Sequence, residues 1–207
     1  MARRPLTKPR KNASQERSRA TVDALIEATT RILVREGFDN ASTNRIAEVA
    51  GVSVGSLYQY FPSKEALVIA VIERHQQQLM HVARRALVDV AKLPMKQAVR
   101  KLVATAVEAH SIDPKLHRVL AEQIPRTGKL ENVDVFNREI YGLFRSFLES
   151  HRDECRAVDL DVAAFVCVTS IEALTHTAVV HRSEMLSGEA MATLIEEATR
   201  LIVRYLQ

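Results

Sequence analysis

The sequence predicts an all-α protein with a small N-terminal head and a larger helical body, in about nine helices. Ala, Leu, Glu, Arg and Gln are abundant, whereas the 207 residues include only six glycines, six prolines and 5% aromatic residues. This composition favours helices over strands. Apolar residues also recur at spacings of three and four along most of the chain, with capping and helix-breaking residues between the runs.

The first 13 residues are expected to form a disordered basic arm. They contain two prolines, five Lys or Arg and almost no apolar residues. Residues 1–65 carry eleven basic and seven acidic side chains, a net +4, whereas residues 66–207 carry eighteen of each. The entire excess charge therefore lies in the first third, which favours contact with a polyanion such as DNA or RNA. A solvated tail is the alternative for the arm.

A helix is predicted from Ser14 onward, because its apolar residues share one face at spacings of three and four. That face is formed by Val22, Leu25, Ile26, Ile32 and Leu33. Gly37 is expected to end the helix in a left-handed conformation, with Phe38 as the apolar contact that accompanies such an end.

Two short helices joined by a tight turn are predicted over residues 42–61. Ser42 and Ser53 are good N-caps, and Gly51 can take the positive φ that the turn requires. Small residues at Ala47 and Gly51 are expected to let the helices cross closely. The three-residue turn is typical of a helix-turn-helix.

The second short helix has an apolar anchor and a polar face. Leu57 and Phe61 are expected to point inward. The residues expected to face outward are Val54, Ser56, Tyr58 and Tyr60. Tyrosine hydroxyls are common donors to phosphate oxygens, so this face suits nucleic-acid contact.

A long helix and five further helices are predicted after Pro62. Ser63 caps the long helix, which keeps helical spacing as far as Val90 and spans roughly 42 Å at 1.5 Å per residue. The further helices are expected near residues 95–111, 113–123, 130–154, 159–181 and 188–206.

Residues 18–70 resemble the DNA-binding head of the tetracycline-repressor (TetR) family of bacterial transcriptional regulators. The resemblance rests on Thr43-x-x-Ile46-Ala47-x-x-Ala50-Gly51-Val52-Ser53 and on Gly55-Ser56-Leu57-Tyr58-Gln59-Tyr60-Phe61-Pro62-Ser63-Lys64-Glu65-Ala66-Leu67. After the basic arm at 1–13, it implies a helix-turn-helix DNA-binding domain at 14–62 and a ligand-binding and dimerisation domain at 63–207.

The resemblance also implies which residues contact DNA. Residues 54–60 look like the recognition helix that enters the major groove, and the start of the preceding helix would grip the backbone. The implied DNA-binding residues are Thr43, Asn44, Arg45, Val54, Gly55, Ser56, Tyr58, Tyr60 and Lys64. Many family members carry Lys or Thr where Val54 and Ser56 stand, so base readout here would use methyl groups, hydroxyls and water.

The body is expected to bind a small, mainly apolar effector, because it is neutral overall and rich in Leu, Val, Ile and Phe at inward positions. A strongly anionic effector is disfavoured unless Arg126 or His176 faces it. The candidate ligand residues are His110, Phe144, Phe147, Glu172 and His176. Glu172 and His176 have two other interpretations, as satisfied buried polar groups or as a pair across a dimer seam. The polar stretch 123–126 is a candidate pocket mouth.

A homodimer is expected through the last two helices. Residues 160–180 are apolar on more than one face, and one helix cannot hide two apolar faces in a monomer of this size. In the family these helices form a four-helix seam between subunits, which the stripe of Ala190, Leu194, Ala198, Leu201 and Ile202 would fit.

Several other classes are disfavoured by the sequence. Neither the two cysteines, Cys155 and Cys167, nor the seven histidines show metal-ligand spacing, and no cofactor is expected. The longest apolar run, 162–168, is far shorter than a membrane span, and no secretory h-region follows the basic N-terminus, so a cytoplasmic protein is expected. Nothing matches a phosphate loop or a catalytic constellation, so an enzyme is not expected.

The sequence therefore predicts a homodimeric regulator that binds a palindromic DNA operator and is released by a ligand, repression being the commoner outcome in the family. The alternative is a helical small-molecule carrier or enzyme with an accessory nucleic-acid-binding head. A helical adaptor that binds only protein would leave the basic first third unexplained.

Overall fold

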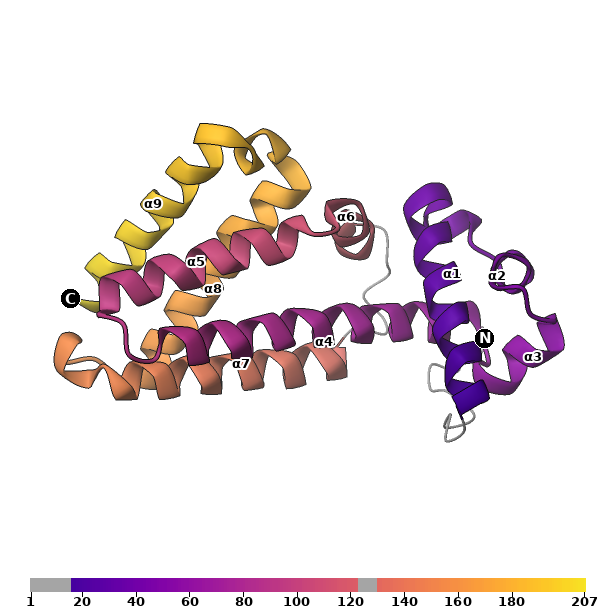
Figure 1. The fold of residues 1–207 in the computed structure, drawn as a ribbon, viewed down its shortest axis with the longest axis horizontal. Helices are drawn as coiled ribbons and strands as arrows, with labels where there is room; N and C mark the ends of the chain where they lie inside the picture. The colour runs from indigo at the N-terminus through magenta and orange to yellow at the C-terminus, as the bar shows by residue number, and fades with distance from the viewer. Residues whose placement is uncertain (1–15, 123–129) are drawn as a thin grey trace, which may run out of the picture. The chain divides into compact units, whose positions relative to one another are not determined.

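The computed structural model describes residues 16–122 and 130–207, and these residues form nine α-helices and two short 3-10 helices without a strand (Figure 1). The prediction of an all-α fold is confirmed. The predicted arm at 1–13 and the candidate pocket mouth with Arg126 lie outside the described residues.

The helices follow the predicted order closely. Their bounds are α1 Glu16–Asn40, α2 Thr43–Ala50, α3 Val54–Tyr60, α4 Lys64–Val90, α5 Met95–Ser111, α6 Pro114–Glu122, α7 Leu130–Ser150, α8 Leu160–His181 and α9 Gly188–Leu206. The 3-10 helices are η2 Arg152–Glu154 and η3 Ser183–Leu186.

The helix expected over 130–154 is shorter than predicted. It ends at Ser150, and the chain continues into η2. Within η2, the Glu154 Oε2 accepts a hydrogen bond of 2.9 Å from the backbone N–H of Met95. Pro94, the N-cap residue of α5, offers no side-chain hydrogen bond, so Glu154 satisfies a donor that α5 would otherwise leave open.

The chain forms two compact units. Among the described residues, the first comprises 16–76, 118–122 and 130–132, and the second comprises 77–117 and 133–207. The predicted domain boundary at residue 62 stays a prediction. The first compact unit extends beyond that residue and includes the first half of α4.

The first unit is a small helical head with one apolar core. Helix α1 packs against α2, and α2 packs against α3. The core receives side chains from all three helices and from the start of α4, including Leu25, Ile32, Leu33, Ile46, Leu57, Phe61 and Leu67.

Local sequence signals place the helix ends of the first unit. Ser42 and Ser53 accept hydrogen bonds from the backbone N–H groups of Arg45 and Ser56, so both are N-caps as predicted. Gly37 and Gly51 have φ of 79° and 68°. A Cβ at Gly51 would meet nothing within 4 Å, so the expected close crossing at Gly51 is wrong and the glycine serves the backbone conformation.

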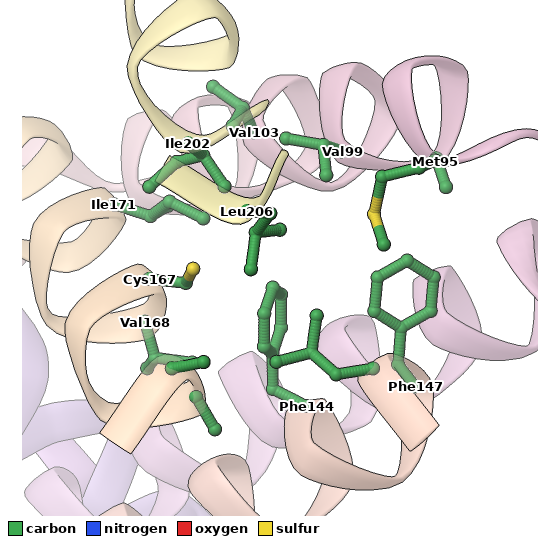
Figure 2. Packing of buried hydrophobic residues seen from close by; sticks show 14 of the residues in the cluster. Met95, Val99, Val103, Phe144, Phe147, Cys167, Val168, Ile171, Ile202 and Leu206 are labelled. Atoms are coloured by element: carbon green, nitrogen blue, oxygen red, sulfur yellow. The ribbon is translucent and has the colours of Figure 1, made fainter. Parts of the chain in front are cut away.

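The second unit has a separate core between α5, α7, α8 and α9. Figure 2 shows side chains from these helices pointing toward one another, with Phe144 and Phe147 below Met95, Val99 and Leu206. Helix α5 packs against both α8 and α9. Leu148, Ile202 and Leu206 are at most 1% exposed in this cluster.

Among the described helices, α8 is long and apolar enough to cross a membrane by length and composition alone. Ten of its 22 residues are buried, including Ala163, Cys167 and Ile171 of the core cluster. Its apolar character is therefore partly explained by packing inside the second unit.

Candidate nucleic-acid interface and ligand region

The turn between α2 and α3 is held by backbone hydrogen bonds. The N–H of Gly51 donates to the Glu48 carbonyl at 3.1 Å, and the N–H of Val52 donates to the Ala47 carbonyl at 3.0 Å. These bonds satisfy the last carbonyl groups of α2 and aim the chain into the Ser53 cap of α3. The geometry is that of a helix-turn-helix, as predicted.

Tyr60 does not face outward, and that prediction is wrong. Its side chain is only 7% exposed, and its hydroxyl donates to the Ser18 Oγ at 3.2 Å. The reason is spacing, because Tyr60 lies three positions after buried Leu57 and therefore on the same side of α3. Tyr60 ties α3 to α1 through this hydrogen bond.

Tyr58 lies on the exposed side of α3, as predicted. It is 40% exposed, and its hydroxyl lies 3.0 Å from the Oγ1 of Thr43, the first residue of α2. One of these two hydroxyls donates to the other, which leaves one O–H of the pair for another acceptor. The pair thus presents a donor that bridges both helices of the motif, suited to a phosphate oxygen.

Arg45 is exposed and paired with acids of the head. Its Nη1 donates to the Glu48 Oε2 at 2.8 Å, and its Nε lies 3.7 Å from the Glu36 carboxylate. The hydrogen bond to Glu48 and the two negative charges raise the pKa of Arg45 further above its ordinary value. Exposed ion pairs are weak, so Arg45 can exchange Glu48 for a phosphate at small cost. The neighbouring Asn44 is exposed.

Lys64 contacts the end of α1. Its Nζ donates to the Phe38 carbonyl at 2.9 Å and lies 4.2 Å from the centroid of the Phe38 ring. A lysine near helix-terminal carbonyls is favourable for the fold. The ammonium has three donors, so this contact leaves capacity for a phosphate.

The start of α3 offers little side-chain bulk. Gly55 is exposed, and Val54 is half-buried. The Ser56 Oγ lies 2.8 Å from the Ser53 Oγ, so its hydroxyl is engaged with the cap. The sequence interpretation missed Gln59, which is exposed on α3 four positions after Gly55. The available signal was its position four residues after Gly55, which places both residues on the same side of the helix.

Two of the predicted ligand residues, His110 and His176, both contact a third residue, His117, which the sequence analysis did not predict. The His117 Nε2 lies 2.8 Å from the His176 Nδ1, a hydrogen bond between α6 and α8. The His117 ring also packs edge-on against the rings of His110 and His176, at centroid distances of 5.0 and 4.9 Å. We call His110, His117 and His176 the histidine trio. His117 stands among the apolar residues Leu116, Val119 and Leu120 of α6, and no motif in the sequence marks it as a ligand residue.

The other predicted ligand residues lie elsewhere. Phe144 and Phe147 are packed in the core cluster with ring centroids 5.5 Å apart. Glu172 is exposed on α8, while His176, one turn later, is half-buried in the trio. The predicted five residues therefore do not form one cluster.

The described residues contain no group of three His, Cys, Asp or Glu with the geometry for a metal ion. The histidine trio is thus held by a hydrogen bond and by edge-on ring contacts. Both cysteines are free thiols. Burial raises the pKa of Cys167 to about 12, so its thiol is protonated and unreactive at neutral pH.

The predicted dimerisation stripe does not lie on one face of α9. Leu194, Ala198 and Ile202 are buried in the single chain, whereas Ala190 and Leu201 are exposed. The stripe splits because steps of four residues advance about 40° around a helix, so the line from Leu194 to Ile202 rotates into the core. On α8, Val162 and Phe165 are each 53% exposed. The second apolar face of α8 is therefore open in the single chain.

Two family models match this chain. The model described as bacterial regulatory proteins of the tetR family matches residues 25–71, and the model described as the tetracyclin repressor-like C-terminal domain matches residues 94–206. Together they cover the helix-turn-helix and most of the second unit.

Curated relatives match part of the chain. A nucleoid occlusion factor, SlmA, from Haemophilus ducreyi is 32% identical over 119 residues, which is 56% of this chain and 55% of that protein. The transcriptional repressor NicS from Pseudomonas putida is 27% identical over 134 residues, or 63% of this chain and 62% of that protein. The matched region thus spans little more than half the length of these relatives.

Solved structures share the fold over nearly the entire chain. The fatty acid degradation regulator FadR from Bacillus halodurans has a TM-score of 0.69 and 17% identity, covering 88% of this chain and 94% of its own. FadR from Bacillus subtilis, solved in complex with stearoyl-CoA, has a TM-score of 0.68 and 18% identity, covering 89% and 99%. With both family models matched and the helix-turn-helix in place, this chain belongs to the TetR family of bacterial transcriptional regulators.

Proposed function

We propose that this protein is a transcriptional repressor that binds a palindromic DNA operator as a homodimer and leaves it when a small molecule binds the second unit. The observation that carries the proposal is the α2–turn–α3 geometry. It buries Leu57 and Tyr60 in the head and leaves Tyr58, Gln59 and Gly55 exposed on one short helix. Such a helix fits the major groove.

The charge distribution supports DNA as the partner. Residues 1–65 hold the whole net charge of +4. The Tyr58–Thr43 pair, Arg45 and Lys64 supply donors for phosphates around the exposed helix.

The dimer is proposed to form through the exposed faces of α8 and α9. Phe165 and Val162 on α8 and Leu201 on α9 are large apolar side chains left exposed in the single chain. A single seven-residue α3 reads few base pairs, and two copies related by a twofold axis read a palindrome.

The effector is proposed to be mainly apolar. The second unit has an apolar core, and the histidine trio supplies half-buried polar groups that can orient a guest. A FadR of similar fold was solved with stearoyl-CoA, so long-chain acyl compounds are the first class to test. Imidazole N–H groups of the trio would donate hydrogen bonds to a polar head group.

Release by the effector requires a difference in affinity between two states. Moving the DNA-competent population from 99:1 to 1:99 needs about 5.5 kcal/mol of differential effector binding. Helix α4 runs without interruption from Lys64 to Val90 and contributes residues to both units, so it is the natural element to carry the coupling. A regulator that binds bacterial DNA would act in the cytoplasm, where the DNA lies.

The function is tested by selecting bound duplexes from a random library and measuring affinity at several salt concentrations. We expect an inverted repeat with half-sites about 34 Å apart or a multiple of that distance. With six to ten phosphate contacts, the logarithm of affinity should fall with the logarithm of salt with a slope of about −5 to −9. Absence of any enriched sequence, or a flat salt response, contradicts the proposal.

The effector is tested by mass spectrometry of the natively purified protein and by melting curves with palmitoyl-CoA, palmitate and free CoA. A rise in melting temperature with the acyl compounds but not with free CoA supports an acyl-binding body.

Deleting residues 1–13 should lower DNA affinity and the salt slope without lowering the melting temperature, if the arm contacts phosphates.

A further inference from the structure

The exposed face of α3 carries one amide side chain with its hydrogen-bonding groups available. Gln59 is exposed, and its side chain makes no hydrogen bond to any residue that the structure describes. The other polar side chains of this helix are engaged, because Tyr58 contacts Thr43 and Ser56 contacts Ser53. Tyr60 is buried with its hydroxyl on Ser18.

Helix geometry places Gln59 directly outward. Leu57 and Tyr60 point into the head, and Gly55 and Gln59 are four positions apart on the opposite side. Whatever surface approaches α3 from outside therefore meets Gln59 and the backbone of Gly55.

Gly55 is not required by the fold of the head. Its backbone has no positive φ, and a Cβ added there would meet only the Ser53 Oγ, at an ordinary contact distance of 3.9 Å. A side chain would fit within the protein, so its absence leaves space beside Gln59 on the outer face. That space admits a base edge close to the helix.

We infer that Gln59 reads an adenine in each operator half-site, with Gly55 providing the room for the base pair to approach. This inference rests on the proposed function. A glutamine carboxamide can accept from the N6 amino group of adenine and donate to its N7, a pairing that no other base offers in the major groove. Gln59 is thus the specificity-determining residue of α3, while Tyr58 and Lys64 position the helix.

The test compares duplexes selected from a random library by the wild-type chain, Gln59→Ala, Gln59→Glu and the control Gln78→Ala. Gln78 is an exposed glutamine on α4, outside the helix-turn-helix. The wild type and Gln78→Ala should enrich the same motif, with adenine at one symmetric position in each half-site.

Gln59→Ala should lose the preference at that position alone. In the wild type, the adenine site should bind about 5- to 150-fold more tightly per half-site than sites with another base at that position. In Gln59→Ala this ratio of affinities should fall toward one. Gln59→Glu should move the preference toward cytosine, because the N4 amino group of cytosine donates a hydrogen bond to a carboxylate. Gly55→Ala should weaken binding to the selected site at least tenfold while its melting temperature does not fall.

The outcomes separate the two ideas. If the wild type enriches no sequence, the proposed function fails, and this inference fails with it. If the wild type enriches a motif and Gln59→Ala enriches the same motif with equal discrimination, the function stands and the assignment of Gln59 is overturned. If the motif depends on Gln59 but Gly55→Ala binds as tightly as wild type, the role of Gly55 is overturned.

Discussion

Tyr58 and Tyr60 are two positions apart on α3 and have opposite environments. Tyr58 is 40% exposed and bonded to Thr43, whereas Tyr60 is 7% exposed and bonded to Ser18. The sequence motif contains both tyrosines, but the spacing of each from buried Leu57 determines which tyrosine is buried in the head. One tyrosine is therefore available to a phosphate, and the other holds α1 against α3.

The two hydroxyls can be separated by experiment. Tyr58→Phe should lower affinity for all DNA sequences by roughly 3- to 10-fold, because about 1 kcal/mol of hydrogen bonding to phosphate is lost without base discrimination. Tyr60→Phe should instead lower the free energy of unfolding by about 0.5–1.5 kcal/mol. Affinity for specific and random duplexes, with urea unfolding, measures both. A Tyr58→Phe protein that changes base preference would contradict the positioning role.

Gly51 and Gly55 form a second contrast at the residue scale. Gly51 has φ of 68° with open space around it, and Gly55 has no positive φ and nearly open space. Alanine at Gly51 should cost about 1–2 kcal/mol of stability from backbone strain alone. Alanine at Gly55 should be neutral or stabilise by up to about 1 kcal/mol, since it lies within a helix. Chemical unfolding of the two variants checks this, and equal losses would refute the assignment.

At the scale of one element, α7 shows how a distant contact ends a helix. The helix was expected to continue to residue 154, yet the chain leaves it after Ser150 and Glu154 reaches the N-terminus of α5. His151 is buried beside this contact, and its Nε2 lies 3.0 Å from the Leu93 carbonyl, which accepts if that nitrogen is protonated. The tertiary hydrogen bonds outweigh the local preference.

The Glu154 contact should be measurable. Glu154→Ala leaves the Met95 N–H without this partner and should cost about 1 kcal/mol of stability, as the loss of a helix cap does. Asp153→Ala, an exposed neighbour in the same 3-10 helix, is the matched control and should change little. Equal melting temperatures for the two variants would show that the contact contributes nothing.

Helices α8 and α9 each divide their apolar residues between the core and the exterior. A glutamate at Ala198, which is 4% exposed in the core cluster, should unfold the second unit, because a buried unpaired carboxylate costs several kcal/mol. A glutamate at Phe165 or Leu201, both exposed, should give folded monomers that lose operator binding. Light scattering and circular dichroism distinguish the cases. Phe165→Glu and Leu201→Glu proteins that both remain dimers would place the seam elsewhere.

At the scale of the molecule, the order and bounds of the helices were largely predictable from local signals. Ser42, Gly51, Ser53 and Pro62 mark their helix ends through capping and backbone geometry, which depend on neighbours in sequence. The buried side of α3, the split stripe of α9 and the trio around His117 depend on packing between helices. Periodicity identifies that a face exists, and it does not identify the helix that covers it.

The histidine trio gives the ligand proposal its most specific test. His117 forms a hydrogen bond with His176 and an edge-on ring contact with His110, so it joins α5, α6 and α8 within the second unit. His117→Ala removes both ring contacts and the hydrogen bond from one position. If the trio orients the effector, the concentration of palmitoyl-CoA or of the identified natural effector that releases DNA should rise at least tenfold, which is about 1.4 kcal/mol of lost differential binding.

Effector-free DNA binding should stay near wild type, because the head residues are untouched. His81→Ala, an exposed histidine on α4, is the matched control and should respond like wild type. Fluorescence anisotropy of a labelled operator, titrated with effector, measures both affinities on one sample. A His117→Ala protein that folds, binds DNA normally and releases it at the wild-type effector concentration would exclude the trio from effector recognition, and the polar anchor would then have to lie on another surface of the second unit.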